Sequence, residues 1–476
     1  MGAYGPPRSP LKLTQKQRER LHRPRPVLFC IIVGLFCSPW LALLGIDTYL
    51  RQQQVKTNLQ ADTFFDQIPV HTSNASAEHI DRLGAQLGLS PNADYANPVI
   101  INGRAARDFA AIETAINEFL HSQTSKVSGP LDPLPTELES YIRTYQPTIE
   151  EIENALLIRE TPRWEMDSAR MTQPDYPPPG FFNIRSLQKL LLLSAMQAHQ
   201  QGQTQKVFSI LEASWQLNKT ITDRSDLSSQ VLVAVISAQR ASILRHLNHT
   251  PTQWQSRLRS QSQIQPIMKG IVFETWLRYR ISQNAWLPRP TVVADANLGE
   301  KLSAMVANRF SLQSYYKLIS LNNTQTAHRT LEQLSGLNVC TTPQITAEKR
   351  LADVKPASWN RERSGASEAS AFVMAKRWQI AGMRSLSIEL SQHVLQLKSQ
   401  AQAQGAWPIS HAPIASIACP GETWIYTHHA DNSITLSLSK TLLTPGAIPL
   451  TYRSSPPYPH IARPSPRKPT LPNHKQ

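Results

Sequence analysis

An uncharged run from Val27 to Ile46 constrains the fold of this chain more than any other feature. In helical form the run just spans the hydrocarbon core of a bilayer. Pro39 inside the run is compatible with a membrane helix, because neighbouring groups can satisfy the carbonyl that proline leaves free. We therefore expect residues 27–46 to form a transmembrane helix that contacts the lipid bilayer.

The charges beside the run predict its orientation. Residues 1–26 carry seven basic side chains and one acidic side chain, whereas Asp47 and then Arg51 follow the run. Such a bias keeps the N-terminus in the cytoplasm and sends the rest of the chain across the membrane. The sequence thus predicts a single-pass protein of the inner (plasma) membrane with a periplasmic or otherwise extracytoplasmic body.

A cleaved signal peptide and a helix buried in a soluble core are the two alternatives. A signal peptide has a short basic region, an apolar core of about 7–15 residues and a small-x-small cleavage site. Here the arm and the run are longer, and residues 43–47 (LLGID) offer no such site. A buried helix rarely follows a polybasic arm at the start of a chain, so a retained anchor is favoured.

The formal net charge of +15 is of the size found in nucleic-acid-binding proteins, but it is unevenly distributed along the chain. Much of it lies in residues 1–26 and in residues 453–476, which hold five basic side chains and no acidic one. A nucleic-acid footprint is expected to cluster on a folded element. We expect no nucleic-acid partner, and we expect the two basic ends to meet anionic lipid or the envelope.

The four cysteines fall into two pairs. Cys30 and Cys37 lie inside the apolar run, where thiols behave as small apolar groups. Cys340 and Cys419 lie in the translocated part, which is expected to be oxidising, and we predict that they form a disulfide. A metal site is the alternative, but neither cysteine belongs to a CxxC pair, which argues against zinc.

The apolar spacing predicts a mainly α-helical protein: a transmembrane helix, then a helical bundle with an αα-hairpin, and a small antiparallel β element near the C-terminus. The predicted division is a basic cytoplasmic arm (1–26), the membrane helix (27–46), a membrane-proximal helical region (47–147), a bundle core (148–340), a long helix with the β element (341–453) and a disordered Pro-rich tail (454–476).

A helical hairpin around Gly202 is the clearest motif. Asn183 can cap a helix that runs to Gln201, Gly202 can end it, and Thr204 can begin its partner. Thr148 and Glu151 fit a capping box at the start of another helix. Further helices are predicted over 226–248, from Thr250-Pro251 onward, and over 267–281, parts of 298–334 and 367–404.

An alternating pattern replaces the helical one after the last helix. Residues 423–428 and 433–439 flank Ala430-Asp431-Asn432 and predict a β-hairpin. Residues 450–453 could add a third short strand.

Three segments carry a resemblance: LIRETPRWEMD (157–167), FNIRSLQKL (182–190) and LEASWQLN (211–218), with Gly202 and Asp223-Arg224. Together they resemble an uncharacterised group of bacterial membrane-anchored helical proteins, known as conserved hypothetical proteins. The resemblance implies an envelope location and a helical fold, and no reaction. The hairpin around Gly202 is also similar to a tetratricopeptide unit, although no second copy follows at a period of about 34 residues.

Candidate binding residues are few. Trp164, Glu165 and Asp167 set two carboxylates beside an aromatic ring, which could bind sugar or serve acid–base chemistry, or could simply cap and cover helices. The segment from Tyr176 to Phe182, which includes Phe181, could present aromatic rings on a stiff polyproline rod, or could fold back onto the bundle.

Two further pairs give weaker signals. His428 and His429 would point to opposite faces of a strand, which makes a poor metal site. Glu139-Ser140 is faintly similar to the catalytic pair of lytic transglycosylases, without their Gly-Leu-Met-Gln pattern.

No HExxH, GxSxG, phosphate-loop or GxGxxG motif occurs in the sequence. We therefore predict no catalytic residues, cofactor or metal, and we expect a binding or scaffolding module with an envelope protein as partner. The alternatives are a hydrolase or lyase acting on the cell wall and an accessory subunit of a secretion or transport complex. Converging carboxylates near Trp164 would favour the enzyme, and an exposed apolar groove along residues 183–218 would favour the scaffold.

Overall fold

A computed structural model of the chain describes residues 48–49, 51–89, 100–168, 170–172, 181–259, 263–285, 312–338, 340, 364–440 and 449–454. The chain divides into two compact units, residues 1–63 with 292–318 and residues 64–291 with 319–476. In the first unit the described residues 51–63 are helical. The predicted membrane helix at 27–46 lies outside the described residues, as does the predicted disordered tail apart from Ser454, which is buried and hydrogen-bonded to Ile434.

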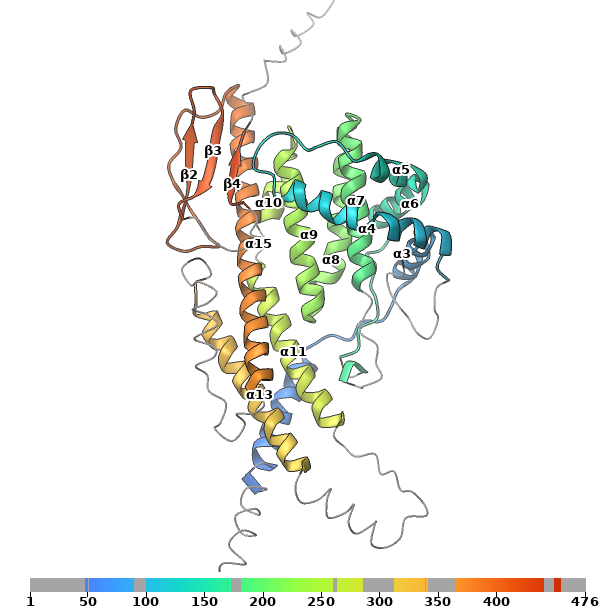
Figure 1. Cartoon of the computed structure of the whole chain (residues 1–476), viewed down its shortest axis with the longest axis vertical. Helices are drawn as coiled ribbons and strands as arrows, with labels where there is room; N and C mark the ends of the chain where they lie inside the picture. Colours follow the sequence, from blue (N-terminus) through green and yellow to red (C-terminus); the bar gives the residue numbers. More distant parts are fainter. Residues whose placement is uncertain are drawn as a thin grey trace, which may run out of the picture. The chain divides into compact units, whose positions relative to one another are not determined.

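The second unit is mainly helical with one small antiparallel sheet, which confirms the predicted fold class for this part of the chain (Figure 1). Its helices are α3 (Ala75–Gln86), α4 (Gly103–Thr124), α5 (Thr136–Thr144), α6 (Gln146–Ile158), the 3-10 turn η1 (Arg170–Thr172), α7 (Phe181–Gln200), α8 (Thr204–Thr222), α9 (Leu227–His246), α10 (Gln253–Arg259), α11 (Ile264–Ala285), α13 (Leu312–Ser335, which begins in the first unit) and α15 (Ser364–Gln404). The strands are β1 (Ile414–Ala415), β2 (Thr423–His428), β3 (Ile434–Leu438) and β4 (Thr451–Arg453).

The predicted hairpin around Gly202 is present as α7 and α8. Gly202 has φ +72°, the left-handed conformation that ends α7, and α8 begins at Thr204 as predicted. The stripe of α8 faces the core through Val207, Leu211 and Leu217. α7 is buried along most of its length, and no large apolar side chain of residues 183–218 is exposed.

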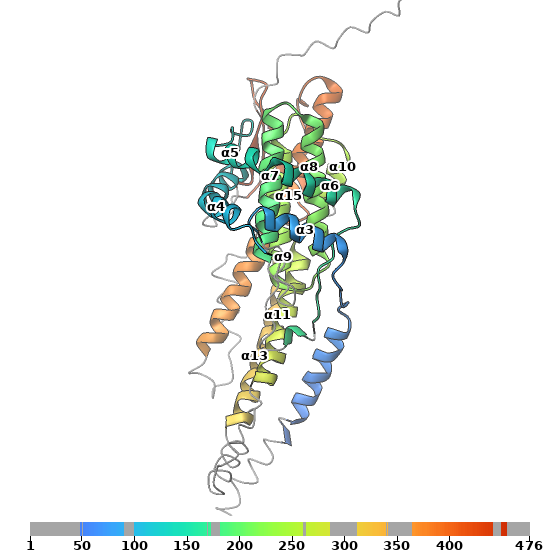
Figure 2. The same ribbon diagram turned by 90° about the vertical axis from the view of Figure 1, so that its right-hand side faces the viewer.

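Three layers build the second unit (Figures 1 and 2). α3 to α6 lie on one side of α7–α9, and α15 with the sheet lies on the other side. α9 occupies the middle and packs on α7, α8, α4, α11 and α15. The apolar cluster under the first two layers is continuous from Ile80 through Leu190 to Ile236.

Several predicted helix starts are wrong by two or three residues. α6 begins at Gln146, because Pro147 suits the first helical turn. Thr148 therefore lies inside α6, and no capping box forms. α7 begins at Phe181, which places Asn183 in its first turn rather than at its cap. α10 begins at Gln253, after the predicted start at Thr250-Pro251.

α15 and the sheet form the C-terminal layer. α15 ends at Gln404 before Gly405, whose φ is +76°, as predicted. The strand order is β1-β2-β3-β4, with Trp424 opposite Leu438 and Leu436 opposite Tyr452. The predicted hairpin is present as β2 and β3, with Asn432 at φ +59° in the turn between them. The predicted third strand is present as β4.

One described helix, Leu227–His246 (α9), is long and apolar enough to cross a membrane. In the folded chain 78% of its apolar window is buried inside the molecule. The core around α9 therefore explains its apolar composition without a membrane.

Candidate functional site

The aromatic–carboxylate segment predicted from the sequence is used for internal contacts. Trp164 is 4% exposed, and its Nε1 donates to Asp81 Oδ1 of α3 at 3.0 Å. Arg170 pairs with Glu165, Nη1 to Oε1 at 2.6 Å, and its backbone N–H donates to Asp167 Oδ1 at 3.2 Å. Trp164, Glu165 and Asp167 are thus engaged with Asp81 and Arg170.

Asn74 explains why this segment is held so firmly against α3. Its Oδ1 caps α3 by accepting from the Ala77 N–H at 3.0 Å, and it also accepts from the Arg163 N–H at 3.0 Å. Its Nδ2 donates to the Thr161 carbonyl at 3.0 Å. One amide therefore closes a helix end and fastens the strand-like segment after α6, which places Trp164 in the core.

The remaining sequence candidates do not assemble into a site. Tyr176 lies outside the described residues, and Phe181 is the first residue of α7, with its side chain undescribed. Glu139 pairs with Arg143 on the same helix, Oε1 to Nη2 at 2.7 Å. The described residues hold no group of three or more His, Cys, Asp or Glu side chains that could bind a metal ion.

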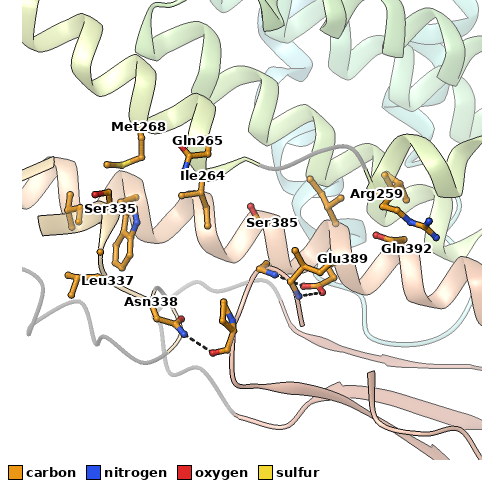
Figure 3. Close-up of a pocket in the computed structure, with 18 residues that line it drawn as sticks. Arg259, Ile264, Gln265, Met268, Ser335, Leu337, Asn338, Ser385, Glu389 and Gln392 are labelled. Carbon is orange, nitrogen blue, oxygen red and sulfur yellow. Dashed lines mark hydrogen bonds between the residues drawn. The ribbon is translucent and has the colours of Figure 1, made fainter. Parts of the chain in front are cut away.

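A cavity of about 430 Å³ lies elsewhere in the second unit, and sequence reasoning did not find it (Figure 3). Its walls come from the end of α10, the start of α11, the end of α13, the middle of α15 and the loop between β1 and β2. Its floor is apolar and buried, formed by Leu258, Met268, Leu334, Trp378 and Ile388. Its rim is mixed and more exposed, so the space is amphipathic.

Glu389 on α15 is the buried carboxylate of the cavity wall, 6% exposed. The backbone N–H groups of Ile417 and Ala418 donate to it at 2.6 and 3.2 Å, and Ser416 Oγ donates at 2.8 Å. Burial raises the pKa of Glu389, but the nearby His393 and the hydrogen bonds from residues 416–418 outweigh burial and lower the pKa below its usual value. Glu389 therefore stays ionised at neutral pH and fastens residues 416–418 to α15.

Ser416, Glu389 and His393 are the residue types of a hydrolase triad in the wrong order. A triad needs the imidazole between the nucleophile and the carboxylate. Here the carboxylate lies in the middle, and His393 Nε2 is 3.7 Å from Glu389 Oε1. The Ser416 hydroxyl donates to Glu389 and accepts from the Cys419 N–H at 3.0 Å, so no imidazole lies between the hydroxyl and the carboxylate.

The predicted disulfide partners meet beside the cavity. The sulfurs of Cys340 and Cys419 are 2.13 Å apart, at disulfide distance. Asn338 supports the pair, because its Nδ2 donates to the Pro420 carbonyl at 2.8 Å and its Oδ1 accepts from the Cys340 N–H at 2.9 Å. The disulfide thus joins the two wall segments that follow α13 and β1.

The disulfide was the sequence signal that could have pointed to this cavity. Once Cys340 and Cys419 are paired, Leu337 and Asn338 must lie near Ile417 and Pro420. The other walls come from α10, α11 and α15, and no local spacing brings these helices to the same place.

No protein family, curated protein or solved structure matches this chain. The resemblance to membrane-anchored helical proteins therefore stays a prediction.

Proposed function

We propose that this protein is a binding protein of the cell envelope, anchored by residues 27–46, and that its ligand occupies the cavity beside the disulfide. The cavity carries the proposal. Its volume of about 430 Å³ lies within the range of about 300–1,000 Å³ found for ligand sites, and its apolar floor with a few polar rim groups is typical of them.

Binding is favoured over catalysis because the reactive groups of the wall are already engaged. Glu389 accepts hydrogen bonds from Ser416, Ile417 and Ala418, so its carboxylate holds residues 416–418 against α15. A hydrolase needs an activated nucleophile or a free acid–base pair facing the substrate. The cell-wall hydrolase alternative gains no support from these contacts.

The anchor is proposed from the charge bias around residues 27–46 and from the apolar length of that run. α9 is no competing candidate, since it is the central helix of the second unit. A protein partner in the envelope would need a surface other than α7, because α7 is buried along most of its length.

Photo-crosslinking in intact membranes tests the proposed function. Ile417 on the cavity rim is 76% exposed, and Ile158 at the end of α6 is 82% exposed and does not line the cavity. We expect a photoreactive amino acid at position 417 to give a light-dependent adduct, seen by mass spectrometry of the intact protein, and the same amino acid at position 158 to give none. Equal adducts at both positions, or none at 417, would contradict the proposal.

A further inference from the structure

We infer that the cavity binds an amphipathic anion, an aliphatic chain that ends in one carboxylate or phosphate group. This inference rests on the proposed function and names the ligand class of the same cavity. It is drawn from the separation of apolar and charged groups along the cavity walls.

One end of the cavity has no charged side chain in its lining. Met268 and Leu337 lie at this end in Figure 3, and Trp378 and Leu334 belong to the buried floor. Trp378 is 2% exposed and Leu334 0%, so both belong to the buried floor, and the polar Gln265 and Ser335 lie at the exposed edge of this end. An aliphatic chain would lose its contact with water there without leaving a buried polar group unpaired.

Arg259 and Gln392 lie at the opposite end of the cavity in Figure 3. Arg259 is the last residue of α10, and among the described residues no carboxylate lies within ion-pair distance of its guanidinium. A guanidinium is a planar fork of donors that matches a carboxylate or a phosphate. Gln392 supplies a neighbouring amide that can donate to the same group.

Glu389 is the other charged residue of the wall, and it does not cancel Arg259. Three hydrogen bonds from residues 416–418 compensate its charge. A cationic head group at this end would meet Arg259 and find the Glu389 oxygens already engaged. A neutral head group would leave the guanidinium without a counter-ion.

Native mass spectrometry of the full-length protein, released from a non-ionic detergent, tests the inference with four probes that share a dodecyl chain. We expect dodecanoate and dodecyl phosphate to bind, and dodecanol and dodecyltrimethylammonium to bind at least tenfold more weakly, because a charge-assisted hydrogen bond is lost. The tighter of the two anions indicates whether a free fatty acid or a phosphate-bearing lipid is the better match. Each methylene added between octanoate and dodecanoate should tighten binding about fourfold.

Two variants locate the effect. Arg259→Gln should weaken dodecanoate at least tenfold and leave dodecanol unchanged. Arg107→Gln, at an exposed position on α4, is the matched control and should change neither probe.

Equal binding of dodecanol and dodecanoate, or tighter binding of the ammonium probe, would overturn the anion inference and leave the proposed binding function intact. Binding of none of the four probes would overturn the inference, and an adduct at position 417 in membranes would then still support the proposed function.

Discussion

At the scale of single residues, two buried arginines of the second unit have aromatic and hydroxyl groups as partners. Arg240 is fully buried, and its guanidinium lies 4.9 Å from the centroid of the Trp215 ring. Burial and the nearby Arg257 lower the pKa of Arg240 to about 9. Arg245 is equally buried and donates to Ser242 Oγ at 3.1 Å and to Ser391 Oγ at 3.4 Å. Such residues could not be recognised as core from their side-chain type alone, because arginine is almost never fully buried.

His246, the last residue of α9, gives the residue-scale prediction. Its Nδ1 lies 2.9 Å from the Gly129 carbonyl oxygen and its Nε2 3.2 Å from that of Lys126. Burial and the adjacent Arg245 lower the pKa of His246 to about 3, although the two carbonyls favour the protonated ring.

The sign of the pH effect follows from the two states. The unfolded chain binds a proton near pH 6.5, whereas the folded chain binds it only near pH 3, so the unfolded state gains protons over this interval. Stability should therefore fall as the pH is lowered from about 6.5 towards 3. Between pH 7 and pH 4.5 we expect His246 to account for a loss of about 2 to 3 kcal/mol in the free energy of unfolding.

Urea unfolding of the detergent-solubilised protein at the two pH values measures this loss. The substitution His246→Gln keeps an amide near the carbonyls and removes the titration, so the variant should lose less stability than the native protein by that amount. His121→Gln, at an exposed position on α4, is the control and should behave as the native protein does. Parallel losses in the native protein and in His246→Gln would show that His246 is not the titrating group.

At the scale of elements, the sequence predicted helix and strand identity well and helix starts less well. Gly202 and Gly405 end α7 and α15 where expected, because a left-handed residue is a strong local requirement. The capping box predicted at Thr148 is wrong, because the proline one residue earlier supports an earlier helix start. Such competing local signals cannot be ranked from the sequence alone. The cavity could not be predicted at this scale, since residues from five separate segments form it.

The disulfide gives the element-scale prediction, since it joins the segment after α13 to the loop after β1 across a sequence separation of 79 residues. Closing a loop of this length should contribute about 4 to 5 kcal/mol through the entropy of the unfolded chain. We expect a dithiol reductant to lower the urea midpoint of the native protein clearly. The double variant Cys340→Ala with Cys419→Ala should start from the lowered midpoint and show no response to the reductant. A native midpoint that the reductant leaves unchanged would contradict this contribution.

At the scale of the whole molecule, the layers of the second unit explain why the sequence candidate and the structural candidate differ. Trp164 has the residue types of a binding site, yet Asn74 and Asp81 of the first layer hold its segment in the core. The cavity instead opens where α11 and α15 meet the disulfide-linked loops. The local sequence correctly predicted an aromatic ring beside carboxylates at Trp164. Long-range packing against α3 determines that these groups bond to other residues of the same chain.

The last prediction concerns the placement of the whole chain in the membrane, and it can be measured by cysteine labelling. In a background with Cys30→Ala and Cys37→Ala, single cysteines are introduced as Ser9→Cys in the basic arm and Ser122→Cys on the exposed face of α4. The basic arm should remain in the cytoplasm. An impermeant maleimide added to spheroplasts should therefore label the Ser122→Cys variant and leave the Ser9→Cys variant unlabelled. Both should be labelled after detergent is added, which controls for reactivity. Labelling at position 9 in intact spheroplasts would reverse the orientation, and a mature protein whose mass lacks residues 1–46 would replace the anchor with a cleaved signal peptide.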